Sequence, residues 1–266
     1  MDLGLRGRTA LVAAASQGLG KAVARALAVE GANVVMFSRD AGRIEAAARE
    51  VQAAAAESQA RVVGLAADAS RPADIERVVK TTEDSLAGAD VVFCNAGGPK
   101  PGAFDSLSDD DWYSAVDLNL MSAIRLTRLC LPHMRARHWG RVIVSTSYSV
   151  KQPIPNLMLS NAVRSATTAW AKTLGDQVGP EGITVNTIAP GRIDTERIRQ
   201  LDGVIAQQTG RSREEVERDS RAGIPLRRYG RADEFGAAAA FLASEQASYL
   251  SGVTLLVDGG LFRGTY

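Results

Sequence analysis

Apolar runs of strand length alternate with helical stretches along almost the whole of this 266-residue chain. Within the runs the apolar character is continuous, which is typical of parallel strands covered by helices on both faces. Because such strands need crossover connections, the pattern predicts an open, doubly wound parallel sheet of the α/β class. Ligands bind such sheets beyond the carboxyl ends of the strands, so the turns that follow the strands should carry the functional residues.

Seven segments are predicted as strands, at Thr9–Ala13, Asn33–Phe37, Arg61–Ala66, Asp90–Cys94, Arg141–Ser145, Thr184–Ile188 and Thr254–Val257. Helices are predicted at Gly18–Glu30, Ala41–Glu57, Pro72–Leu86, Trp112–Arg137, Leu157–Val178 and Asp233–Ser244. Some helix starts carry capping residues, such as Ser108 before two aspartates and Pro72 at a first helical position. These elements predict a Rossmann-type sheet of seven strands in a single domain over residues 1–266.

Residues 192–228 interrupt the alternation. The segment is rich in Arg, Gln, Glu and Gly, and its Ser212 to Glu215 predict a short capped helix. A connection of this length in a compact domain is usually a lid or disordered. Because it directly follows Ala189-Pro190-Gly191, we interpret it as a substrate lid; a surface insertion without a role is the alternative.

The charge balance argues against nucleic acid or membrane partners. The chain has 31 Lys and Arg against 30 Asp and Glu, spread throughout, so no basic stripe or polybasic patch forms. It has no N-terminal signal pattern and no apolar run of membrane-spanning length, so we expect a cytoplasmic protein. Cys94 and Cys130 are expected as buried thiols, and His133 and His138 as a solvated helix end without a metal site.

The turn between the first strand and the first helix is rich in small residues. Glycines let the backbone approach a pyrophosphate, and a helix N-terminus offers free N–H groups and the positive end of its dipole. We therefore expect a dinucleotide to bind on Ala14, Ser16, Gln17, Gly18, Leu19 and Gly20. The methyl group of Ala14 could crowd the phosphates or disfavour a positive φ.

The end of the second strand predicts which dinucleotide binds. NAD enzymes usually carry an acid there, which accepts a hydrogen bond from the ribose 2′-hydroxyl. Here the position falls on Ser38, and Arg39 follows. A permanently charged guanidinium beside a small hydroxyl suits a 2′-phosphate, so NADP(H) is the preferred cofactor. Asp40 could pair with Arg39 instead, which would leave NAD(H) possible.

Further motifs follow in a fixed order: Asp68-Ala69, Cys94-Asn95-Ala96-Gly97, Asp117-Leu118-Asn119-Leu120, and Asn186 to Thr195 with Pro190, Gly191 and Ile193. In this order and spacing the chain resembles the classical short-chain dehydrogenase/reductase family over essentially its whole length, and the 3-oxoacyl-acyl-carrier-protein reductases most closely. The resemblance implies that Asp68, Ala69, Asn95, Ala96 and Gly97 contribute to the dinucleotide site. It also implies that Pro190, Gly191, Ile193 and Thr195 lie by the nicotinamide carboxamide.

The resemblance fails at the family's catalytic tyrosine and lysine. Residues 140–147 resemble the strand that ends on the active-site serine, so Ser147 and Asn119 match the family's serine and asparagine. Where Tyr-x-x-x-Lys is expected, this chain has Ser160 and Arg164. In the family the tyrosine is the general acid, and the lysine lowers its pKa and binds the nicotinamide ribose. A serine is a weaker and shorter acid than a phenol, whereas Arg164 keeps the charge and could bind ribose hydroxyls.

Two nearby residues could replace the missing pair. Tyr148 directly follows Ser147, and neighbours in an extended chain point to opposite sides. We therefore predict that Tyr148 faces away from Ser147 and packs elsewhere. Lys151 could line the pocket, or it could be an ordinary solvated lysine.

Two functions are compatible with these residues. The first is an NADP(H)-dependent oxidoreductase that acts on a carbonyl or alcohol substrate, small or acyl-carrier-linked, with an altered proton-donating site. The second is a catalytically silent sensor or scaffold that binds a nucleotide. The resemblance also implies a homotetramer built on the long helices at 112–137 and 157–178 and on the C-terminal strand.

Overall fold

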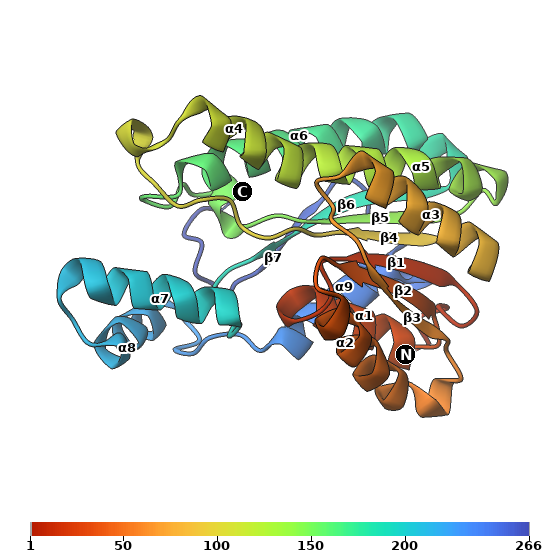
Figure 1. Cartoon of the computed structure of the whole chain (residues 1–266), viewed down its shortest axis with the longest axis horizontal. Coiled ribbons are helices and arrows are strands. Elements are labelled where there is room, and N and C mark those ends of the chain that lie inside the picture. The colour runs from red at the N-terminus through yellow and green to blue at the C-terminus, as the bar shows by residue number, and fades with distance from the viewer. Residues whose placement is uncertain (1, 266) are drawn as a thin grey trace.

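The computed structural model describes residues 2–265 and contains one sheet of seven strands in the order β3-β2-β1-β4-β5-β6-β7 (Figure 1). Every neighbouring pair is parallel. The strands are β1 (Thr9–Ala13), β2 (Asn33–Ser38), β3 (Val62–Ala66), β4 (Val91–Cys94), β5 (Gly140–Ser145), β6 (Ile183–Pro190) and β7 (Thr254–Val257). The predicted fold class is confirmed. Strand order reverses between β1 and β4, which places the ligand crevice of such a sheet at their carboxyl ends.

Helices cover both faces of the sheet (Figure 1). One face carries α1 (Gly18–Val29), α2 (Ala41–Ala54) and α9 (Ala232–Ala243), and the other carries α3 (Pro72–Leu86), α5 (Ser122–Ala136) and α6 (Met158–Val178). Each face has its own apolar core, because the strands are buried on both sides. On the first face, for example, the rings of Phe93 and Phe235 meet edge to face at 6.4 Å.

The predicted helix at 112–137 is wrong in its start and in its continuity. It begins at Asp109, because Ser108 forms a capping box with Asp111, and this α4 segment ends at Val116. A π-helical turn at Asp117–Met121 then joins α4 to α5. Such turns insert one residue into a helix and occur often at functional sites. Here the turn contains Asn119, the residue predicted to belong to the active site.

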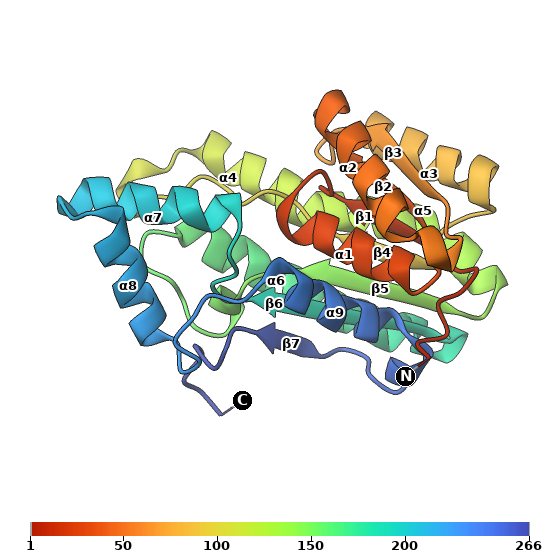
Figure 2. The same cartoon turned by 90° about the horizontal axis from the view of Figure 1, so that it is seen from below.

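Residues 192–228 contain more helix than the sequence predicts. The predicted capped helix exists as α8 (Arg213–Gly223), where Ser212 and Glu215 form a capping box. A second helix, α7 (Glu196–Thr209), was not predicted; Thr195 caps its start. Both helices project beyond the carboxyl ends of the strands, at one end of the molecule (Figures 1 and 2). The segment is therefore positioned beside the ligand crevice.

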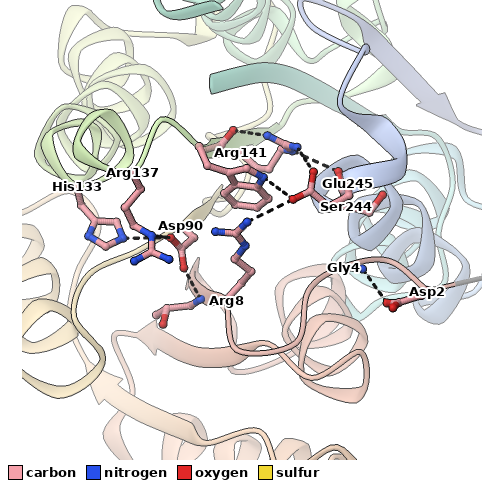
Figure 3. Close-up of polar contacts among 12 residues, drawn as sticks. Asp2, Gly4, Arg8, Asp90, His133, Arg137, Arg141, Ser244 and Glu245 are labelled. Carbon is pink, nitrogen blue, oxygen red and sulfur yellow. Dashed lines mark hydrogen bonds and ion pairs between the residues drawn. The ribbon is translucent and has the colours of Figure 1, made fainter. Parts of the chain in front are cut away.

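At the end of the sheet opposite to α7 and α8, two arginines stack on a tryptophan and pair with a glutamate (Figure 3). The guanidinium carbons of Arg8 and Arg141 lie 3.8 and 4.2 Å from the ring centroid of Trp139. Glu245 accepts a hydrogen bond from the indole nitrogen at 2.8 Å and pairs with both arginines. The arrangement joins the chain just before β1 and β5 to the end of α9, away from the crevice.

Other sequence predictions have mixed outcomes. Cys94 and Cys130 are buried free thiols, as predicted, and burial raises the pKa of Cys94 to about 12. His138 is exposed, as predicted, but His133 is only partly so: its Nε2 lies 3.1 Å from Asp90 Oδ1 (Figure 3). Sequence could not reveal this contact, because residues 43 positions apart form it. Within residues 2–265, no helix combines the length and the apolar character that crossing a membrane requires.

Candidate functional site

A cavity of about 740 Å³ lies at the carboxyl ends of the strands, which is within the range of small-molecule sites. The predicted site residues that line it are Ala14, Ser16, Gln17, Gly18, Leu19, Ser38, Arg39, Asp68, Ala69, Asn95, Ala96, Gly97, Ser147, Ser160, Arg164, Pro190, Gly191, Ile193 and Thr195. Gly20 and Asn119 are the two predicted residues that do not line it.

The first loop presents an open helix N-terminus to this cavity. The N-cap residue of α1, Gln17, makes no capping hydrogen bond, so its side chain does not occupy the first amides of the helix. Ala14 adopts φ +50°, a left-handed conformation that glycine favours. Gly20 has a packing role instead, because a Cβ there would lie 2.4 Å from the carbonyl oxygen of Ala14. The loop thus has the shape that a phosphate-binding turn requires.

The end of β2 leaves Arg39 free to meet a ligand. Asp40, which could have paired with Arg39, caps α2 through Arg43 N at 2.9 Å and lies 3.6 Å from the Arg43 guanidinium. Within residues 2–265, Arg39 has no carboxylate partner and the buried Ser38 Oγ has no hydrogen-bond partner. A buried hydroxyl without a partner costs stability, so this atom fits a ligand oxygen.

The starts of α1 and α7 lie side by side at the cavity wall. A Cβ at Gly18 would lie 3.6 Å from Thr195 Cγ2. Thr195 Oγ1 accepts from Ile198 N at 3.5 Å and thereby caps α7. On the far side Gly97 is open, since a Cβ there would meet nothing within 4 Å. The dinucleotide loops therefore lead directly into the segment that carries α7.

Three polar residues meet where β5 ends. Ser147 Oγ accepts from Ser149 N at 3.1 Å, and Ser160 and Arg164 lie one helical turn apart on α6. Arg164 Nη1 donates to the carbonyls of Ser145 and Thr146 at 3.0 and 3.1 Å. Burial, and to a lesser extent the nearby Arg197, lowers the pKa of Arg164 to about 10. At neutral pH the guanidinium is therefore a buried cation at the cavity wall.

Asn119 lies behind the cavity. Its Nδ2 donates to Ala115 O at 3.4 Å, while its buried Oδ1 has no partner among residues 2–265. The backbone oxygen of Asn119 accepts from Thr167 at 3.4 Å, which ties the π-helical turn to α6. A buried, unpaired amide oxygen is the kind of group that an ordered water satisfies.

The prediction that Tyr148 packs elsewhere is wrong, because Tyr148 is among the residues that line the cavity, as is Ser147. That its ring points away from Ser147 stays a prediction. Ser147 is still extended, but a 3₁₀ turn begins at Tyr148 and ends the alternation on which the prediction rested. Burial raises the pKa of Tyr148, with a smaller opposing effect of Arg192. Lys151 is exposed and does not line the cavity, which settles its two alternatives in favour of a solvated lysine.

Sequence reasoning missed the contribution of α7. Residues Glu196, Arg197, Ile198, Gln200 and Leu201 all line the cavity. The helix is anchored by Asp202, which is buried, pairs with Arg192 and accepts from Tyr229 Oη at 2.8 Å. The signal available in the sequence was Thr195 followed by a first-turn glutamate, a common helix start.

Known proteins match this chain over nearly its full length. A family model described as enoyl-(acyl carrier protein) reductase matches residues 13–262. The NADPH-dependent reductase BacG of Bacillus subtilis is 32% identical over 256 residues, covering 96% of this chain and 98% of that protein. The 3-oxoacyl-[acyl-carrier-protein] reductase FabG of Pseudomonas aeruginosa is 33% identical, covering 98% of this chain and 99% of that protein.

A solved structure also matches nearly the whole of this chain. L-Sorbose reductase from Gluconobacter frateurii, in complex with NADPH and L-sorbose, matches with a TM-score of 0.93 at 30% identity. The match covers 99% of this chain and 100% of that chain. The parallel sheet, the cavity at its carboxyl edge and these full-length matches lead to one conclusion: the chain belongs to the short-chain dehydrogenase/reductase family.

Proposed function

We propose that this protein is an NADPH-dependent reductase that converts a carbonyl group to an alcohol without the family's tyrosine–lysine pair. The observation that carries the proposal is a single cavity. It joins the dinucleotide loops to a reaction end made of Ser147, Tyr148, Ser160 and Arg164. The relatives described as NADPH-dependent support the choice of cofactor.

Residues of this chain fit the phosphates of NADPH. Arg39, which has no ion pair among residues 2–265, and Ser38 Oγ, which has no partner there either, would hold the 2′-phosphate. The open N-terminus of α1 would hold the pyrophosphate, and Arg164 would donate to the nicotinamide ribose. Bound NADPH would supply the hydride that adds to the carbonyl carbon of the substrate.

The carbonyl oxygen needs a hydrogen-bond donor and a proton. Ser147 Oγ would donate to the oxygen, and the positive charge of Arg164 would stabilise the negative charge that develops on it. Tyr148 is the one phenol that lines the cavity among residues 2–265, and its raised pKa keeps its proton at neutral pH. We therefore assign the proton to Tyr148 Oη, because a phenol is a far stronger acid than the hydroxyl of Ser160.

Access to this end of the cavity is proposed to be controlled by residues 192–228. The side chains of α7 line the cavity, whereas α8 lies outside it. Covering the site would exclude water and strengthen the electrostatic effects inside it. Limited proteolysis with and without NADPH tests this role: the lid interpretation predicts protection of residues 196–223 by the cofactor, and equal cleavage would contradict it.

Assembly as a homotetramer is proposed from an exposed helix face. Ala162, Ala166 and Ala169 of α6 are all exposed, so they do not face the sheet. Small side chains allow a second helix to approach closely. A monomeric mass by light scattering at micromolar concentration would contradict this proposal. A reducing, cytoplasmic location is proposed on the free thiols of Cys94 and Cys130.

The reductase function is tested by following NADPH oxidation with a panel of ketones and oxo acids. The proposal predicts turnover with at least one of them. Tyr148→Phe should lower that rate by about 10²–10⁴-fold, the usual contribution of a general acid. Ser160→Ala should lower it by less than about tenfold. Tight NADPH binding without turnover on any substrate would favour the silent sensor or scaffold instead.

A further inference from the structure

Two arginines, Arg164 and Arg197, line the same cavity as the dinucleotide loops. Arg164 comes from α6 and is 9% exposed, whereas Arg197 comes from the first turn of α7. Arg197 Nη2 donates to Pro99 O at 3.4 Å and lies so close to Gly98 that a Cβ there would come within 2.9 Å of it. Arg197 therefore reaches from α7 to the loop after β4, near enough to Arg164 to lower its pKa.

Neither guanidinium has a carboxylate within 4.0 Å among residues 2–265, whereas Arg43 and Arg192, which also line the cavity, do. Arg192 pairs with Asp202, and Arg43 pairs with Asp40. The remaining acidic side chains of the cavity point elsewhere: Asp68 accepts from Ser70 Oγ at 2.8 Å, and Glu196 accepts from Gln200 at 3.4 Å. Arg164 is buried, whereas Arg197 is exposed. A buried cation without a counter-ion is costly, so an anion would be bound favourably beside Arg164, in the cavity that Arg197 also lines.

The donor atoms of Arg164 are only partly used. Its Nη1 donates to two backbone carbonyls, whereas Nε and Nη2 have no partner in the part of the chain that the structure describes. A guanidinium keeps its charge and directs its donors in one plane, so a single free N–H can still donate to a carboxylate oxygen. Nη1 of Arg164 thus holds the end of β5, while Nε and Nη2 remain for the nicotinamide ribose and for one oxygen of a substrate carboxylate.

NADPH does not supply the missing negative charge. Under the proposed function its 2′-phosphate meets Ser38 and Arg39, and its pyrophosphate meets the start of α1. The nicotinamide end carries no anion. We therefore propose, resting on the proposed function, that Arg164 and Arg197 bind a carboxylate of the substrate. The natural substrate is then an oxo acid rather than a neutral ketone or a fatty-acyl thioester.

The test compares oxo acids with their methyl esters, which differ only in charge and one methyl group. Binding of 4-methyl-2-oxopentanoate, phenylpyruvate and 4-oxopentanoate, each beside its ester, is measured by calorimetry on the NADP⁺-loaded protein, which cannot reduce them. At least one acid should bind about 10–100-fold more tightly than its ester, the value of hydrogen bonds to a charged group.

Variants of α7 assign the effect to Arg197. Arg197→Gln should remove most of the preference for the acid, and Arg197→Lys should retain part of it, with NADP⁺ affinity unchanged in both. Arg199→Gln is the matched control, because Arg199 lies on the same helix, does not line the cavity and pairs with Asp194 at 3.3 Å. It should keep the full preference.

Three results would overturn the proposal. The first is equal binding of acid and ester across the whole panel. The second is an equal effect of Arg197→Gln and Arg199→Gln on the preference for the acid. The third is a loss of NADP⁺ affinity in Arg197→Gln, which would assign Arg197 to the pyrophosphate. Failure of the proposed function has a different signature, since the wild-type protein would then bind no NADP⁺ or reduce nothing. Esters that bind and react as well as the acids would refute the anion site alone.

Discussion

Removing the charge of Arg39 should change which dinucleotide the protein prefers. Arg39 has no carboxylate partner among the described residues, so Arg39→Gln breaks no ion pair within the protein. A hydrogen bond to a charged group contributes about 1.5–3 kcal/mol, and the exposure of Arg39 favours the lower value. The dissociation constant for NADPH should therefore rise by about tenfold, whereas that for NADH should stay the same.

Ser38→Asp should act in the opposite sense on the two cofactors. The new carboxylate would repel the 2′-phosphate of NADPH and accept from the 2′-hydroxyl of NADH. Fluorescence titration of each reduced cofactor measures both constants. Arg43→Gln serves as the control, because Asp40 already offsets the charge of Arg43 at 3.6 Å. Equal wild-type affinities for the two cofactors, or an Arg39→Gln variant that keeps its preference, would refute the reasoning.

Three further predictions concern single features. Ala14→Gly should raise the free energy of unfolding by about 1 kcal/mol, because Ala14 has φ +50°; a lower urea midpoint than wild type would contradict this. Tyr148→Phe should slow reduction far more than Ser160→Ala, and equal effects in single-turnover kinetics would remove Tyr148 as proton donor. The preference for oxo acids over esters should fall as the pH rises through about 10, because Arg164 is charged below its lowered pKa and neutral above it. A preference that stays constant at pH values well above 10 would contradict the role of Arg164.

The sheet could be predicted because its strands are continuous apolar runs, and the dinucleotide loops could be predicted because they follow those strands. The helix α7 could not, because its only buried residue is Asp202. Its apolar residues at 198, 201, 204 and 205 have helical spacing, but none of them is buried. Its anchor depends on Arg192 and on Tyr229, which lies 27 positions from Asp202. Long-range polar contacts of this kind leave no local pattern in a sequence.

The reaction end could be predicted only in part, again because some of its features depend on the folded structure. Ser147, Ser160 and Arg164 could be identified by their spacing, which the fold preserves. The position of Tyr148 depends on where an extended strand gives way to a 3₁₀ turn, and a parity argument cannot locate that point. That Arg197 lines the same cavity as Arg164 depends on how α7 packs, so it required the structure.

Transfer of deuterium tests the central claim most directly. The protein is incubated with NADPH deuterated at C4 of the nicotinamide, in one stereochemical form at a time, and with the panel of oxo acids and esters. We predict deuterium on the carbinol carbon of at least one product, from one face of the nicotinamide only. Tight binding of NADPH with no deuterium in any product would show that the site holds the cofactor without reducing a carbonyl group.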